Sequence, residues 1–60
     1  MYRVIKFDKS GLNPVEIAEM KNGSVACRAA KAYSGQTGFK SSVIKFDESE
    51  HEIKSWDYGK

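Results

Sequence analysis

A seven-residue segment occurs twice in this 60-residue chain, and it constrains the fold more than any other feature. Residues 4–10 read VIKFDKS and residues 43–49 read VIKFDES, so the two copies differ only at Lys9 and Glu48. Side chains of a strand point alternately to its two faces, so each copy would place its Ile and Phe on one face and its Val and Lys on the other. The repeat therefore predicts two related strands, each of which opens a hairpin.

The alternation also predicts which face is buried. The residues expected to form the core beneath a covering helix are Ile5, Phe7, Ile44, Phe46 and Ile53. The residues expected on the opposite, uncovered face are Tyr2, Val4, Lys6, Val43, Lys45, Lys54, Trp56 and Tyr58.

The segments around the repeat complete the predicted fold. Each copy runs into turn-forming residues and then a second strand-like stretch, VEIAEM after the first and HEIKSWDY after the second. Between them lies a segment with four alanines, for which Ser24 is a candidate N-cap and Gly35 a candidate C-terminal stop. We expect one domain with a hairpin over 2–20, a helix over 24–34 and a hairpin over 41–58. This is a ββαββ, α+β two-layer fold with one helix packed on a small antiparallel sheet.

Helical periodicity predicts how that helix would face the sheet. The buried arc would contain Val25, Ala29, Ala32 and Tyr33, with Ala26 at its edge. Cys27 and Lys31 would lie on the outer side, flanked by Arg28. Because the buried arc is mostly alanine, we expect the helix to lie close to the sheet.

The sequence is also compatible with two other folds. Asn22–Gly23 is a strong hairpin signal, and a hairpin there would give a small all-β barrel, although four alanines suit a strand poorly. Asn13, Pro14 and Glu16 together are typical of a helix start. A helix there that ended at Gly23 would give a strand-flanked helix-turn-helix.

Composition limits how the chain can be stabilised and where it would work. Cys27 is the only cysteine and His51 the only histidine, so the sequence predicts no internal disulfide, no metal site and no cofactor. No apolar export or membrane segment is recognisable, so we expect a cytoplasmic protein that does not contact membranes. A 60-residue domain buries only about 60% of its unfolded surface, and self-association as a homodimer would relieve this shortage of core.

Charge is unevenly distributed although the net charge is only +2. No acidic residue lies between Glu19 and Asp47, which leaves a basic stretch from Lys21 to Lys45. This stretch is a candidate nucleic-acid interface, with Lys21, Arg28, Lys31 and Lys40 as its contact residues. Because Cys27 is close to two of these cations, it is also a candidate reactive or dimer-linking thiol, although a small packing residue is the simpler interpretation.

Aromatic and lysine side chains that alternate on the strands form the main candidate site. We expect a partner to contact Trp56, Tyr58, Lys54, Lys6, Lys45 and Tyr2. Trp and Tyr are common anchors of protein interfaces, and rings interleaved with lysines also occur in single-strand nucleic-acid binders. No Ser–His–Asp or Cys–His constellation is recognisable, so we expect no enzymatic activity.

The function that these features favour is regulation or inhibition by binding. In size and composition the chain is similar to the compact single-domain proteins that phages and plasmids encode, which mostly bind a host macromolecule. We therefore expect a non-enzymatic protein that occludes a macromolecular partner, with a protein as the favoured partner. A nucleic-acid-binding protein and a homo-oligomeric structural protein are the alternatives.

Overall fold

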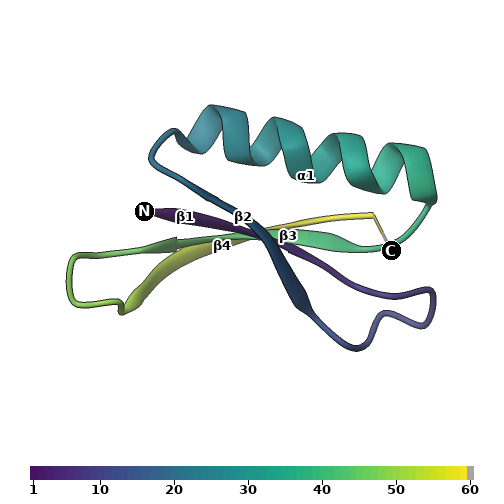
Figure 1. Cartoon of the computed structure of the whole chain (residues 1–60), viewed down its shortest axis with the longest axis horizontal. Helices are drawn as coiled ribbons and strands as arrows, with labels where there is room; N and C mark the ends of the chain where they lie inside the picture. Colours follow the sequence, from purple (N-terminus) through teal and green to yellow (C-terminus); the bar gives the residue numbers. More distant parts are fainter. Residues whose placement is uncertain (60) are drawn as a thin grey trace.

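The computed structural model describes residues 1–59 and confirms the ββαββ fold. Its elements are β1 (Tyr2–Lys6), β2 (Val15–Met20), α1 (Gly23–Thr37), β3 (Ser41–Phe46) and β4 (Glu52–Tyr58). Figure 1 shows α1 lying along one side of a four-stranded antiparallel sheet. The alternative folds are wrong, because residues 15–20 form a strand instead of a helix and Asn22–Gly23 begin α1 instead of a hairpin.

The two copies of the repeat supply the two central strands of the sheet. The strand order is β2-β1-β3-β4, and β1 pairs with β3 in antiparallel orientation. Val4 lies directly opposite Val43, so each copy's valine faces its own equivalent. On either side of this pair, Ile5 faces Ser42 and Ile44 faces Arg3. The two hairpins are thus related by an approximate two-fold axis through the two valines.

The repeat also encodes the turn that follows each strand. Asp8 Oδ1 accepts hydrogen bonds from the backbone N–H groups two and four residues later, at 3.0 and 2.9 Å. Asp47 Oδ1 does the same at 2.9 Å in both cases. In both loops the N–H three residues after the Asp donates to the Asp carbonyl, at 3.0 Å. The residues that the two copies share therefore specify a strand together with its hairpin turn.

Both turns need a left-handed residue at the same position. Gly11 has φ 80° and Glu50 has φ 61°, and each lies three residues after its Asp. A residue with a Cβ is strained in this region by roughly 1–2 kcal/mol, and only glycine adopts it freely. The first loop thus has the favourable residue, while the second tolerates a strained one.

We predict that Gly11→Ala lowers the free energy of unfolding by about 1 kcal/mol, because alanine must adopt the left-handed backbone. Gly35→Ala is the matched control, because Gly35 lies inside α1 and a Cβ there meets nothing within 4 Å. It should stabilise by about 0.5–1 kcal/mol, the usual gain in helix propensity. Urea unfolding measures both variants, and a change of the same sign in both would contradict the loop argument.

The Asp8 carboxylate makes the first loop sensitive to acid. Hydrogen bonds from the Ser10 hydroxyl, the Leu12 N–H and the Asn13 amide lower the pKa of Asp8 from 3.8 to about 2. The folded state therefore binds the proton less readily than the unfolded chain does. By linkage, the stabilisation is fully present above about pH 4 and is lost as the pH falls towards 2.

We predict that the wild-type protein loses stability between about pH 4 and pH 2, and that Asp8→Asn removes this part of the pH dependence. Unfolding by urea at a series of pH values measures it. Parallel curves for the wild type and the variant across this window would show that Asp8 is not the titrating group.

The core lies between α1 and the sheet, on the face opposite to the predicted one. The fully buried apolar residues are Val4, Ala26, Ala30 and Val43. The prediction that the Ile and Phe residues of the repeat form the core is wrong, and the predicted core residue Ile53 is 57% exposed. The alternation correctly groups the residues of one face, but both faces are similarly apolar. Two alanines of α1 approach the valines closely, and this close approach decides which face is covered.

The helix is longer than expected and rotated about its axis. Asn22, not Ser24, is the N-cap, and its side chain accepts a hydrogen bond from the N–H of Val25 at 3.2 Å. The helix continues through Gly35 and ends at Gly38, which has φ 75°. Val25, expected on the buried arc, is 46% exposed. Ala32 is also exposed, whereas Cys27 packs against the core instead of facing outward.

Buried hydroxyl groups fasten the C-terminal half of α1 to the sheet. Ser41 Oγ donates to the carbonyl of Ala30 at 2.6 Å and lies 2.7 Å from Ser34 Oγ. Ser34 Oγ in turn donates to the carbonyl of Tyr58 at 3.2 Å. In the described part of the chain, every buried side-chain polar atom has a hydrogen-bond partner.

Candidate functional site

Four of the six predicted partner-binding residues come together at the N-terminal end of α1. Tyr2 of β1 lies opposite Lys45 of β3, and Lys45 lies opposite Lys54 of β4. Trp56 lies two residues after Lys54 and therefore on the same face. We call Tyr2, Lys45, Lys54 and Trp56 the aromatic–lysine cluster. It lies on the helix side of the sheet, so its predicted position on an uncovered face is wrong.

In this cluster the two rings lie close to each other, and each ammonium group lies over one ring. The Tyr2 and Trp56 ring centroids are 6.2 Å apart with an interplanar angle of 35°. Lys45 Nζ lies 5.6 Å from the Tyr2 centroid, and Lys54 Nζ lies 5.1 Å from the Trp56 centroid. Cation–π attraction of this kind holds each lysine over a ring while leaving its remaining N–H groups for a partner.

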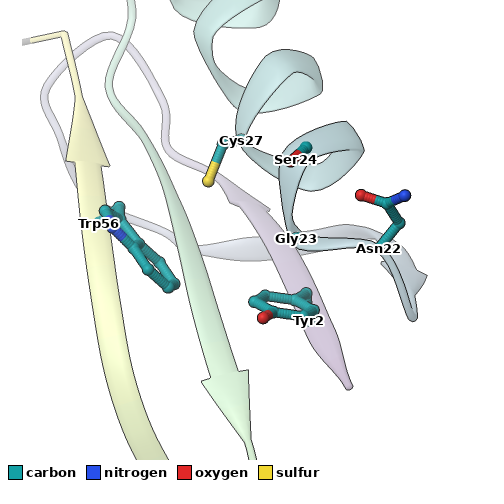
Figure 2. Close-up of a pocket in the computed structure, with 6 residues that line it drawn as sticks. All are labelled: Tyr2, Asn22, Gly23, Ser24, Cys27 and Trp56. Atoms are coloured by element: carbon teal, nitrogen blue, oxygen red, sulfur yellow. The ribbon is translucent and has the colours of Figure 1, made fainter.

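A shallow, open pocket of about 400 Å³ lies between these rings and the first turn of α1. Its lining residues are Tyr2, Asn22, Gly23, Ser24, Cys27 and Trp56. Figure 2 shows the sulfur of Cys27 pointing from the helix towards the space between the two rings. The pocket is therefore lined by two aromatic rings, a thiol and the polar residues at the start of a helix.

Gly23 determines how closely the helix approaches Tyr2. A Cβ at this position would lie 2.7 Å from Cζ of Tyr2 and 2.8 Å from Cε2. Contacts this short do not occur between carbon atoms, so any larger residue would displace the ring or lift the helix start. The Asn22–Gly23 pair thus combines a helix cap with the one residue that lets Tyr2 lie beneath it.

We predict that Gly23→Ala lowers the free energy of unfolding by about 1–3 kcal/mol, the usual cost of overpacking. It should also change the tryptophan emission, because the displaced Tyr2 ring lies next to Trp56. Ser24→Ala is the control, since it lies on the same pocket rim and adds no atoms. Unchanged emission and stability in Gly23→Ala would mean that Tyr2 moves away without cost.

The remaining two predicted residues lie outside the cluster. Tyr58 is next to Cys27 beneath the helix, where hydrogen bonding to Cys27 and burial raise the pKa of Tyr58. It is half-buried and packs against the core. Lys6 lies opposite Ser41 at the other end of β1, away from the pocket.

The residues of the predicted nucleic-acid interface are only partly brought together. Lys21 precedes the helix, and Arg28 and Lys31 are exposed along it, so these three share the helix side of the molecule with the cluster. Lys40 does not join them. Its ammonium group lies 4.8 Å from the Phe7 ring centroid, on the opposite face of the sheet.

An ion-pair cluster on that opposite face was not anticipated from the sequence. Arg3 Nε lies 2.9 Å from a Glu19 oxygen and 3.5 Å from a Glu16 oxygen, and Arg3 Nη2 lies 2.9 Å from Glu50. Hydrogen bonding to Glu19 is the largest cause of a raised pKa of Arg3. The guanidinium carbon lies 4.4 Å from the Phe46 centroid. Pairing the two strands of the first hairpin in their correct register would have found this cluster, because that register places Arg3 opposite Glu19.

Metal-ligating side chains are not clustered in residues 1–59. No group of three or more His, Cys, Asp and Glu side chains is close enough there to hold a metal ion. His51, an exposed residue, lies 3.7 Å from Asp47. Within the same residues, no helix is long and apolar enough to cross a membrane.

Comparison with protein-family models, with curated proteins and with solved structures finds no match for this chain.

Proposed function

We propose that this protein is a small, non-enzymatic binding protein that docks on an acidic protein partner through the aromatic–lysine cluster and thereby occludes that partner. The observation that carries the proposal is the arrangement of two rings and two ammonium groups in one continuous patch on three neighbouring strands. Because strands are rigid supports, little conformational entropy is lost when a partner contacts them.

The composition of the patch is that of an interface anchor. Trp and Tyr are enriched among the residues that contribute most to protein–protein binding. Trp56 and Tyr2 are half-buried, so each ring is held by the core while part of it remains accessible. The pocket between them offers a recess of about 400 Å³ for one side chain of the partner.

The electrostatic field of this side favours an acidic partner. Lys21, Arg28 and Lys31 lie on the helix side with the two lysines of the cluster, and α1 contains no acidic residue. A surface of one sign raises the association rate with a partner of the opposite sign, and the effect weakens with salt.

A single-stranded nucleic acid is the second candidate, because the same basic side carries rings on which bases could stack. The geometry favours it less. The two rings are tilted by 35°, and each already has a lysine over its face. A stacked base would have to displace that lysine.

We predict that Trp56→Ala weakens partner binding by about 2 kcal/mol, or roughly 30-fold, as expected for a central anchor. The double variant Lys45→Ala/Lys54→Ala should weaken it about tenfold at low salt, mainly through a slower association rate. Lys6→Ala is the matched control, because this lysine lies on the same strands but away from the pocket.

The test is to capture proteins from a nuclease-treated cell extract on the immobilised wild type and on each variant. The affinity of any captured protein for the wild type and the variants is then measured by titration. A protein bound by the wild type and Lys6→Ala but lost with Trp56→Ala supports the proposal, provided that circular dichroism shows Trp56→Ala folded. Salt-sensitive binding of single-stranded oligonucleotides with no such protein supports the second candidate. Binding that is equal in all variants contradicts both.

A further inference from the structure

The face of the sheet that α1 leaves open carries the second apolar surface of the molecule. Within residues 1–59, α1 covers one face only (Figure 1). The strand register places Ile5, Ile44 and Phe46 on the other face, and the same alternation continues to Phe7, just after β1. All four are half-buried. We call this the open face. Ile17 and Ile53 lie in the edge strands beside it and are 44% and 57% exposed.

We propose that the open face binds a second copy of this chain, so that the protein is a two-fold symmetric dimer formed by two sheets packed face to face. This proposal concerns a different face from the aromatic–lysine cluster and does not depend on the proposed function. In the dimer the cluster of each subunit remains outside, on the helix side.

The size of the core gives the first argument. The fully buried apolar residues of the described chain are two valines and two alanines, all with small side chains. Single cores of domains this small rarely supply more than about 3–5 kcal/mol of net stability. Packing two open faces together would bury two isoleucines and two phenylalanines from each subunit. The repeat would then contribute to two cores, one inside each subunit and one between subunits.

The charges at the two ends of the open face give the second argument, because they are complementary. At the Phe46 end, Arg3 is surrounded by the carboxylates of Glu16, Glu19 and Glu50, so the cluster carries excess negative charge. At the Phe7 end lies the ammonium group of Lys40, and one row nearer the centre the Asp57 carboxylate accepts a hydrogen bond from the Ser42 hydroxyl. A two-fold axis in the plane of the interface and across the strands superposes opposite ends. Each Lys40 would then meet the carboxylates of the other subunit, twice per dimer.

The area of the face is sufficient. The molecule measures 32 × 20 × 16 Å along its principal axes, and the view along the shortest axis in Figure 1 shows the sheet edge-on. The outline of the whole molecule, 32 by 16 Å, bounds this face at about 500 Å² per subunit or about 1,000 Å² in total, so nearly complete coverage reaches the lower limit for a specific interface. Its isoleucines and phenylalanines are interspersed with charged groups, because Arg3 lies opposite Ile44 and Asp57 lies opposite Ser42.

The sheet edges are poorly suited to the alternative, in which strands of two copies pair side by side. The register of each edge strand is interrupted, at Ile17 in β2 and at Ile53 in β4, and Pro14 precedes β2. Bulges and proline at an edge hinder pairing with another strand. Association through the open face avoids these obstacles.

The solution mass, measured by sedimentation or light scattering across a concentration series, tests the proposal. We expect a dimer for the wild type. Ile44→Lys places a charge at the centre of the open face and should raise the dimer dissociation constant at least about 100-fold. Val25→Lys is the matched control, because Val25 is an apolar residue on the outer side of α1 with 46% exposure. It should leave the dimer intact.

Charge exchange tests the orientation of the two subunits and remains informative if Ile44→Lys fails to fold. Lys40→Glu should weaken the dimer about tenfold at low ionic strength, and Glu50→Lys should do the same. The double variant Lys40→Glu/Glu50→Lys should regain most of the lost affinity, because each new pair is again of opposite sign. A monomeric wild type at millimolar concentration overturns the proposal. A dimer that Ile44→Lys leaves intact, or additive losses in the double variant, also overturns it.

Discussion

The contact between Val4 and Val43 lies at the centre of this structure. These valines are paired across the two middle strands, are fully buried, and meet Ala26 and Ala30 of the helix. Every other contact between the layers lies around this point. Tyr2 and Trp56 flank the valine pair towards the N-terminal end of α1. The hydroxyl groups of Ser34 and Ser41 flank it towards the C-terminal end. Because alanine is small, the helix lies close enough to cover the valines, and the larger Ile and Phe side chains remain on the other face.

The sequence repeat accounts for much of this arrangement. Its valine and aspartate positions have equivalent structural roles in the two halves, the valines in the central pair and the aspartates in the turns. The differences between the halves lie mainly in what surrounds the repeat. Tyr2 and Trp56 enlarge one end of the helix side, and Gly23 makes room for the Tyr2 ring there. The site is therefore an asymmetric addition to a nearly symmetric sheet.

The sequence predicts the element order and the grouping of residues by face, because both follow from local periodicity and turn chemistry. It does not predict which face the helix covers, since Val with Lys and Ile with Phe are both plausible core pairs and only the packing of α1 distinguishes them. The grouping of Tyr2, Lys45, Lys54 and Trp56 was predictable for the same reason, whereas their enclosure by Asn22–Gly23 was not. A close approach between Gly23 and Tyr2 depends on tertiary structure, which no pattern of period 2 or 3.6 records.

The pairing of β1 with β3 has a consequence for how the chain folds among its neighbours. Since the two central strands share Val-Ile-Lys, β1 of one molecule could pair with β1 of another around the same valine, with Tyr2 and Arg3 in place of Ser41 and Ser42. At the valine pair, side-chain complementarity therefore discriminates only weakly between the correct pairing within one chain and pairing between two chains. The tether through β2 and α1 must supply that discrimination, by keeping the proper partner at a high effective concentration. A connection that closes quickly would therefore limit domain-swapped and aggregated forms.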